Sequence, residues 1–284
     1  MIILLSKKNT KMNKPVYKLL DWIDESKLDW QTLCLNPNAI ELLKANPDKI
    51  NWDYLSENPS AIELLKNNKD KIHWEYLSLN PNAIELLKAN PDKINWDCLS
   101  CNPSAIELLK ANPYKINWFY LCKNTSYEAI ELLKENPDKI YWLYLTKNSS
   151  AIELLEANQD KINWVYLSSN ENAIELLKTN QNKIDWEFLS ANPNAIELLK
   201  ANPDYIDWHY LSKNQNAIEL LEANQDKIDW KLFSLNPSIF TLDYNQMRIN
   251  FEDLEEDIIK EVMKPIRIFR NLELYGYDID DMFD

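Results

Sequence analysis

The stretch Ile50–Lys71, INWDYLSENPSAIELLKNNKDK, decides the fold, because copies of it make up most of the chain. Near-identical copies begin at Ile72, Ile94, Ile116, Ile140, Ile162, Ile184 and Ile206, and looser copies begin at Leu28 and Ile228. The tryptophans of successive copies are 22 residues apart, except for a single step of 24. A fixed period of this size is typical of a protein built from stacked repeats rather than around one globular core.

Each unit is predicted to form two short helices. The first, residues 52–56, follows Asn51, whose side chain can cap the free amides of a helix. The second, residues 59–66, follows Asn58 and begins with a proline, which loses no hydrogen bond at the first helical position. Asn68 comes next, and we expect it to end the helix in the left-handed conformation that asparagine tolerates.

A single unit is too small to fold alone. It buries about six apolar side chains, each contributing roughly 1.5–3 kcal/mol, whereas ordering its backbone and side chains costs about 1.5 kcal/mol per residue. Neighbouring units must therefore share their apolar faces. The predicted fold is all-α, an α-solenoid of about ten two-helix repeats with N- and C-terminal helical caps. With helix layers about 8–10 Å apart, it should form a rod or arc roughly 80–100 Å long.

The pattern divides the chain into four parts. These are a disordered leader at 1–14, an N-terminal cap helix at 15–27, the solenoid at 28–242, and a C-terminal helical cap with an acidic tail at 243–284. Met12, just before the patterned sequence, is a second candidate for the natural start. The hydrophobic positions of the N-terminal cap helix are Val16, Leu19, Leu20, Trp22 and Ile23. In the C-terminal cap, a helix is expected over Phe251–Met263 behind Asn250.

The amino-acid composition limits the kinds of partner that the protein is expected to bind and its expected location. The net charge of −14 argues against nucleic acid and against anionic membrane surfaces. The apolar run Met1–Leu5 is too short for a signal peptide or a membrane span. Four cysteines without a secretion signal indicate a reducing compartment inside a cell, so we expect a protein that is not secreted.

The repeat motif NPNAIELLKANPDKINW, at Asn80–Trp96, resembles a repeat abundant in large paralogous families of giant DNA viruses related to mimivirus. Three segments also resemble the caps of that family: Asn13–Trp22, Asn236–Phe240 and Lys264–Arg267. The resemblance covers nearly the whole chain from Met12. It implies a viral protein located in the cytoplasm of the infected host cell or in the virion. The resemblance implies no activity, and it identifies no functional residues in this sequence.

The sequence predicts no catalytic residues, no cofactor and no metal site. His73 and His209 occupy different positions of units six apart, so they should not meet. Cys98 and Cys101 form a C-x-x-C, but each occupies an ordinary repeat position, and we interpret them as substitutions. The remaining cysteines, Cys34 and Cys122, replace the repeat serine. A single glycine excludes a glycine-rich phosphate loop.

Two positions of the first helix vary between units, the residue after the tryptophan and the residue after the serine. They are four residues apart, so they share one face and form, unit after unit, what we call the variable stripe. The predicted partner-binding residues are Asp53, Glu75 and Asp97 in early units, Phe119, Leu143, Val165, Lys123 and Lys147 in the middle, and Tyr127 in the irregular unit. Three successive apolar side chains at an otherwise polar position favour a docking patch. The alternative is that they pack against neighbouring units or against the two residues inserted near Tyr127, which account for the tryptophan step of 24.

These observations favour a non-catalytic protein–protein interaction scaffold. Its expected partner is a protein or peptide, not nucleic acid or a membrane, and a monomer is favoured. Three alternatives stay open: a structural or self-assembling virion component, a single-stranded nucleic-acid reader, which would need a basic and aromatic stripe, and an enzyme that uses the non-repeated C-terminal region.

Overall fold

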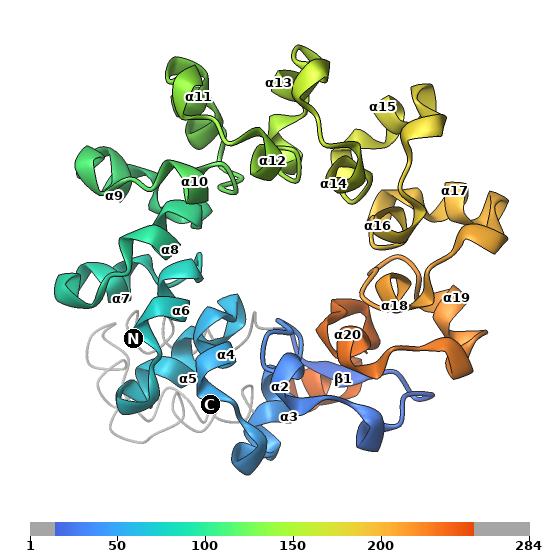
Figure 1. Cartoon of the computed structure of the whole chain (residues 1–284). Coiled ribbons are helices and arrows are strands. Elements are labelled where there is room, and N and C mark those ends of the chain that lie inside the picture. The colour runs from blue at the N-terminus through green and yellow to red at the C-terminus, as the bar shows by residue number, and fades with distance from the viewer. Residues whose placement is uncertain (1–14, 253–284) are drawn as a thin grey trace, which may run out of the picture. The chain divides into compact units, whose positions relative to one another are not determined.

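The computed structural model describes residues 15–252 (Figure 1). The described residues fall into two units, one of residues 19–240 and the other of residues 15–18 together with 241–252. Short helices recur in a regular pattern along the repeat region, so the predicted all-α solenoid is confirmed. The leader at 1–14 and the chain beyond residue 252 lie outside the described residues.

Each repeat begins with a short α-helix whose first residue is the repeat tryptophan. The predicted cap is confirmed at Asn51, whose Oδ1 accepts hydrogen bonds from the amides of Asp53 and Tyr54, each 3.1 Å long. These first helices are α2 (Trp30–Leu33), α4 (Trp52–Glu57), α6 (Trp74–Leu79), α8 (Trp96–Cys101), α10 (Trp118–Leu121), α12 (Trp142–Leu145), α14 (Trp164–Ser168), α16 (Trp186–Ser190), α18 (Trp208–Leu211) and α20 (Trp230–Leu235).

The second helix of most repeats is entered through a 3-10 turn. Asn58 caps the turn η3 (Pro59–Ala61) by accepting a 2.9 Å hydrogen bond from the Ser60 amide, and α5 follows. The second helices are α3 (Ile40–Ala45), α5 (Ile62–Lys66), α7 (Ile84–Lys88), α9 (Ile106–Lys110), α11 (Tyr127–Glu135), α13 (Ile152–Glu156), α15 (Ile174–Thr179), α17 (Ile196–Ala201) and α19 (Ile218–Glu222). Further entry turns are η6 (Pro103–Ala105), η9 (Ser149–Ala151), η11 (Glu171–Ala173) and η13 (Pro193–Ala195), whereas the equivalent turn η16 (Pro237–Ile239) is followed by a strand instead of a helix.

The predicted left-handed ending of the second helix is wrong. Asn68 has φ −134° and ψ 54°, and its side-chain amide donates to the Leu64 carbonyl at 2.9 Å. The side chain thus satisfies a helix-end carbonyl without a left-handed backbone. A third element that the sequence did not predict, a 3-10 turn, then leads to the next repeat. These turns are η2 (Pro47–Lys49), η4 (Lys69–Lys71), η5 (Pro91–Lys93), η7 (Pro113–Lys115), η8 (Pro137–Lys139), η10 (Gln159–Lys161), η12 (Gln181–Lys183), η14 (Pro203–Tyr205) and η15 (Gln225–Lys227).

One buried asparagine per repeat joins it to the preceding repeat. Asn58 Nδ2 donates to the carbonyl oxygens of Cys34 at 2.8 Å and Asn36 at 2.9 Å, while its Oδ1 caps η3. Equivalent side chains, none more than 3% exposed, form what we call the asparagine ladder: Asn36, Asn58, Asn80, Asn102, Asn124, Asn148, Asn170, Asn192, Asn214 and Asn236. Because buried polar groups must be paired, the ladder fixes the spacing and register of successive repeats.

The repeat serine makes a second bond between repeats. Ser56 Oγ donates to a carbonyl one turn earlier and accepts a 3.0 Å hydrogen bond from the His73 amide of the next repeat. Cys34 keeps this geometry through a 3.3 Å contact of its sulfur with the Asn51 amide, and Cys122 does the same in its own repeat. Both cysteines therefore act as substituted serines.

The same bonds connect the last repeat to the first. Asn36 Nδ2 donates to the carbonyls of Ser234 at 3.0 Å and Asn236 at 2.9 Å. The Asp29 amide donates to Ser234 Oγ at 2.9 Å. The expected rod or arc is therefore wrong: the repeats of residues 19–240 close into a ring, which Figure 1 shows.

Further contacts at the closure also repeat those elsewhere in the ring. Lys27 Nζ lies 5.1 Å from the ring centroid of Trp230, and equivalent lysines lie 3.9–5.8 Å from other repeat tryptophans. In addition, α2 packs directly on α20. The hydroxyl of Thr32 donates to the Lys231 carbonyl at 3.0 Å. The first repeat thus occupies the position, next to the tenth repeat, that an eleventh repeat would occupy.

The curvature of the ring follows from unequal packing on its two sides. First helices of neighbouring repeats pack directly on each other, as α4 does on α6 and α6 on α8, whereas second helices contact mainly the 3-10 turns beside them. The spacing is therefore smaller on the side of the first helices. These helices form the inner side of the ring, and the second helices form the outer side (Figure 1).

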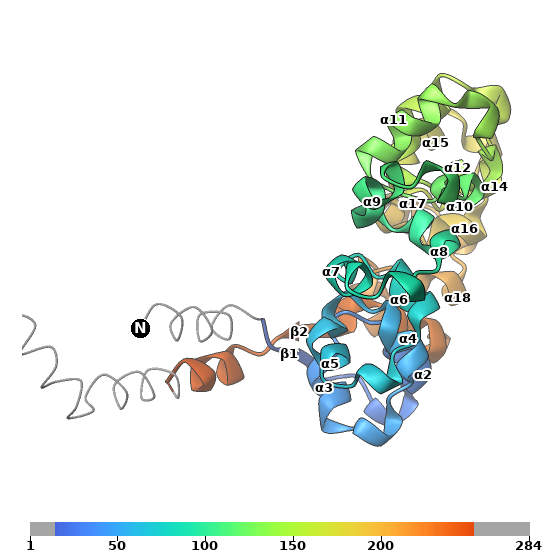
Figure 2. The same ribbon diagram turned by 90° about the vertical axis from the view of Figure 1, so that its left-hand side faces the viewer.

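Both predicted cap boundaries need correction. In place of the cap helix at 15–27, the chain forms strand β1 (Tyr17–Leu19) and the 3-10 turn η1 (Glu25–Lys27). Strand β1 pairs with β2 (Phe240–Leu242), and the two lie side by side in Figure 2. Pairing with β2 satisfies the backbone hydrogen-bonding groups of β1. The hydrophobic periodicity of the sequence could not predict this pairing. A helix covers residues 244–252, so the predicted start behind Asn250 is wrong; Asp243 caps this helix by accepting from the Gln246 amide at 3.0 Å. The rest of the predicted helix Phe251–Met263 lies outside the described residues.

Candidate functional site

The variable stripe lies on the first helices and therefore on the inner side of the ring (Figure 1). Leu143 is 42% exposed and Val165 41%. Asp53, Glu75 and Asp97 are exposed at the same position of earlier repeats. The inner face thus presents the side chains that differ most between repeats.

Phe119 differs from its two apolar neighbours, because it is packed. Its ring centroid lies 4.2 Å from that of Tyr144, 5.2 Å from that of Tyr120 and 5.5 Å from that of Tyr141. The alternative interpretation, packing within the ring, therefore applies to Phe119, whereas Leu143 and Val165 remain available to a partner.

The structure separates Tyr127 from the other predicted partner-binding residues. Tyr127 is the first residue of α11, a second helix, which lies on the outer side of the ring (Figure 1). Ser126 caps α11 by accepting a 3.3 Å hydrogen bond from the Ala129 amide. The inserted residues therefore lengthen an outer helix and leave the stripe unchanged.

Lys123 and Lys147, which the sequence assigned to the stripe, lie over aromatic rings of the inner face. Lys123 Nζ is 4.9 Å from the ring centroid of Tyr144 and 5.2 Å from that of Phe119. Lys147 Nζ is 4.0 Å from the ring centroid of Tyr166. Such cation–π contacts hold the two ammonium groups without neutralising their charge.

Sequence reasoning missed a row of rings in contact beside these lysines, one pair edge to face and the other stacked. The ring centroids of Tyr166 and Phe188 are 5.6 Å apart, and those of Phe188 and Tyr210 are 5.4 Å apart. We call these three side chains the aromatic row. Lys213 Nζ lies 5.1 Å from Tyr210 at one end, and Lys147 reaches Phe188, two repeats further on, at 5.7 Å. The signal was available, because the second residue after the tryptophan is aromatic in most repeats.

The inner face carries two groups of like-charged side chains, and Glu187 lies at the stripe position between Lys147 and Lys213. We call the first the acidic sector, formed by Asp53, Glu57, Glu75 and Asp97, and the second the basic sector, formed by Lys123, Lys147 and Lys213. Burial raises the pKa of the Glu57 carboxyl. In the basic sector, burial lowers the pKa of Lys147 and of Lys213; the charge of Lys123 lowers that of Lys147 further, and Lys147 acts likewise on Lys213.

The cysteine and histidine motifs have structural roles. Burial, followed by the charges of Glu75 and Asp97, raises the pKa of Cys98 to about 11, so its thiol is protonated at neutral pH. All four cysteines are free thiols. His73 caps α6, because its Nδ1 accepts from the Tyr76 amide at 3.4 Å. Within residues 15–252 there is no group of three or more His, Cys, Asp or Glu side chains suited to holding a metal ion.

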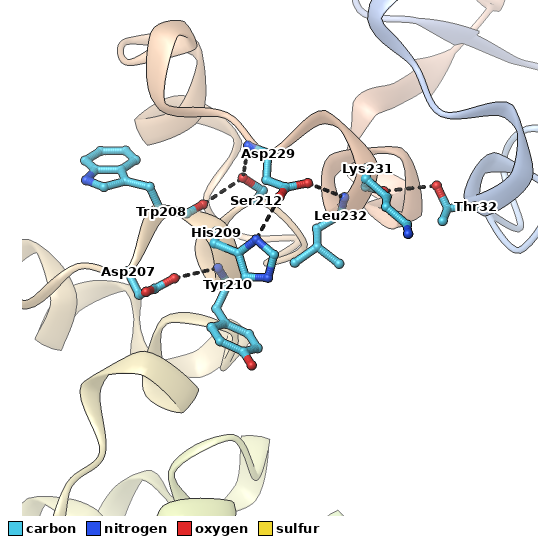
Figure 3. Close-up of polar contacts among 9 residues, drawn as sticks. All are labelled: Thr32, Asp207, Trp208, His209, Tyr210, Ser212, Asp229, Lys231 and Leu232. Carbon is cyan, nitrogen blue, oxygen red and sulfur yellow. Dashed lines mark hydrogen bonds and ion pairs between the residues drawn. The ribbon is translucent and has the colours of Figure 1, made fainter.

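His209 pairs with an aspartate of the next repeat, as Figure 3 shows. Its Nδ1 lies 2.7 Å from Asp229 Oδ2, and Asp229 Oδ1 accepts a 2.9 Å hydrogen bond from the Leu232 amide, which caps α20. Burial would raise the pKa of Asp229, but the Leu232 amide and His209 together outweigh it, so the pKa is lowered. This contact links two repeats and is remote in sequence from His73.

No helix within residues 15–252 has the length and apolar character needed to cross a membrane. The chain matches no known protein family, no curated protein and no solved structure. Its class therefore follows from its architecture, which is that of a helical repeat scaffold and fits a general role in protein interaction.

Proposed function

We propose that this protein is a non-catalytic protein-interaction scaffold that binds a segment of a partner polypeptide along the variable stripe on the inner face of its ring. In line with the viral resemblance, we propose that the partner is a viral or host protein of an infected cell. Concave faces of helical repeat proteins suit this task, since side chains from several repeats converge on one ligand.

The observation that carries the proposal is the contrast between the two sides of the ring. The second helices repeat the same exposed ion pairs, with Lys Nζ 2.7–2.9 Å from Glu Oε1, at Glu41–Lys44, Glu85–Lys88, Glu131–Lys134 and Glu175–Lys178. Such pairs stabilise a helix and distinguish no partner. The inner side instead exposes Leu143 and Val165 where other repeats carry charges. An apolar patch bordered by charges is typical of an interaction site.

Two observations weigh against the other functional classes. Closure uses the surfaces at both ends of the array, which disfavours head-to-tail assembly through the end faces of residues 19–240. The acidic sector and the net charge of −14 disfavour a nucleic-acid reader, which needs a continuous basic groove.

Peptides selected from a random display library against the wild-type protein test the proposal. They should bind the double variant Leu143→Asp/Val165→Asp at least tenfold more weakly, because each aspartate places an unpaired charge in an apolar contact. Tyr114→Asp is the matched control: Tyr114 is 80% exposed, lies outside the stripe, and stands where most repeats carry Asp.

Circular dichroism melts of the three proteins establish that the substitutions leave the ring folded. Selected peptides that bind the double variant and the control with equal affinity would show that the stripe is not the binding site.

A further inference from the structure

The three lysines of the basic sector are brought together by the ring and not by the sequence. Lys123 and Lys147 belong to neighbouring repeats, whereas Lys213 lies three repeats further on. Lys147 and Lys213 contact opposite parts of the aromatic row, at Tyr166 and Tyr210, 4.0 Å and 5.1 Å from the ring centroids. Side chains of repeats this far apart converge only on the inner side of a strongly curved array.

These ammonium groups differ from the lysines of the outer side. Lys178 Nζ, for example, lies 2.8 Å from Glu175 Oε1. Among the residues that the structure describes, no carboxylate lies within ion-pair distance of Lys123, Lys147 or Lys213. Their ammonium groups instead contact aromatic rings. Three positive charges thus lie on the inner side of the ring outside any ion pair with a described carboxylate, since the neighbouring Glu187 is hydrogen-bonded to Tyr210.

This arrangement costs stability. Burial and mutual repulsion lower the pKa of Lys147 and Lys213, which means that the fold disfavours their charged forms. Like charges that destabilise the fold and share one concave surface are a feature of binding sites. A negatively charged ligand would relieve the repulsion.

We infer that the basic sector is a recognition site for an acidic polypeptide segment, whose carboxylates pair with Lys123, Lys147 and Lys213 and whose apolar side chains contact Leu143 and Val165. The inference rests on the proposed function, because it specifies the chemistry of the partner at the same inner face.

The surroundings of the lysines favour a peptide over a nucleic acid or a phosphate polymer. The exposed side chains of Leu143 and Val165 lie at the neighbouring position of the stripe and suit an apolar side chain. The acidic sector continues the same inner face and would repel a backbone that carries a charge on every unit. A peptide can place carboxylates at the lysines and uncharged residues elsewhere.

A fluorescein-labelled peptide, in which pairs of glutamates alternate with single leucines, tests the inference by fluorescence anisotropy with the full-length protein. It should bind the wild type, bind more weakly as salt is added, and lose affinity when glutamine replaces its glutamates. Each of Lys147→Gln and Lys213→Gln should raise Kd about tenfold, as expected for loss of a hydrogen bond to a charged group. Lys178→Gln changes the net charge equally, lies on the outer side, and should leave Kd unchanged.

Lysine side-chain NMR of the wild type gives a second readout that needs no substitution. The peptide should shift the ε-methylene signals of the basic sector and leave that of Lys178 in place. The inference is overturned if the wild type does not bind the peptide, or if the two basic-sector variants bind it as well as the wild type does. It is also overturned if tripolyphosphate or oligouridylate binds in a lysine-dependent manner and more tightly than the peptide.

These failures are distinct from failure of the proposed function. Library peptides that depend on Leu143 and Val165, but not on the lysines, would leave the scaffold proposal intact and remove only the acidic partner.

Discussion

Asn36→Ala tests the closure of the ring and the asparagine ladder together. Asn36 is fully buried. Its Nδ2 donates to the carbonyls of Ser234 and Asn236, at 3.0 and 2.9 Å, and its Oδ1 accepts from the Asn38 amide at 3.0 Å. Alanine leaves the two buried carbonyls and the partly buried Asn38 amide without these partners. At about 1–1.5 kcal/mol for each bond, the free energy of unfolding should fall by about 3–4.5 kcal/mol.

Asn102→Ala provides the matched control within the array. Asn102 makes the same three bonds, to the carbonyls of Ser78 and Asn80 at 3.0 and 2.9 Å and from the Ser104 amide at 3.0 Å. In a closed ring the two substitutions should have equal effects, to within about 0.5 kcal/mol. If the array were open, Asn36 would keep only the hydrogen bond from the Asn38 amide, and the loss of that bond would cost about 1 kcal/mol.

Urea unfolding followed by both tryptophan fluorescence and circular dichroism measures these differences. The two probes must give coincident transitions, because repeat proteins can unfold in parts. A large effect of Asn102→Ala beside an effect of about 1 kcal/mol for Asn36→Ala would refute the reasoning.

The remaining predictions concern individual side chains of the inner face. Phe119→Asp should lower the melting temperature by several degrees, because it removes a packed ring, whereas Leu143→Asp should leave it nearly unchanged; equal effects would contradict the difference in packing. Cys98, with a pKa of about 11, should react with iodoacetamide at pH 8 about a hundredfold more slowly than a thiol with the ordinary pKa of 9.0, and mass spectrometry would detect faster labelling. Lys213→Met should stabilise the protein at neutral pH, because the lowered pKa of Lys213 makes its charge unfavourable below that pKa. The gain, limited by partial exposure of the side chain, should disappear in melts above pH 10.5, the ordinary lysine pKa, where Lys213 is neutral in both states.

The local structure of each repeat was predictable because short-range chemistry determines it. Asn51 and Asn58 cap helices as expected, and the apolar positions Leu55 and Leu65 are fully buried. The ion pairs of the second helices also follow from their i, i+3 spacing. In contrast, the conformation of Asn68 was not predictable from its residue type, because a side-chain bond to a carbonyl competes with the left-handed backbone.

Ring closure was not predicted, because it depends on a small rotation per repeat that accumulates over the array. That rotation is set by the difference in packing between the two sides, which the period of the sequence does not reveal. The sequence did contain one indication of closure at the ends of the array. Asn36 and Ser234 are the usual repeat residues, although in an open array they would have no neighbouring repeat to which they could bond.

Placement on the inner face was predictable only in part. Differences between repeats predicted the variable stripe. They did not predict that Lys147 and Lys213 of the stripe lie close together, because the curvature of the ring brings these side chains together. The aromatic row was not predicted, because its rings occupy a position that is aromatic in most repeats and therefore does not stand out in a comparison between repeats. The separation of Tyr127 from the other predicted partner-binding residues was not predicted, because the repeat pattern does not reveal that the irregular repeat lengthens α11 on the outer side.

Native-state hydrogen exchange of four aspartate amides tests the closed ring most directly, and it needs no substitution. In each case the backbone amide donates to a serine Oγ of the preceding repeat at 2.9 Å; the pairs are Asp29–Ser234, Asp185–Ser168, Asp207–Ser190 and Asp229–Ser212. Only the Asp29 bond crosses the closure. If the ring is closed, Asp29 should be protected from exchange as strongly as the other three. Rapid exchange of Asp29 beside slow exchange of Asp185, Asp207 and Asp229 would show that the array is open.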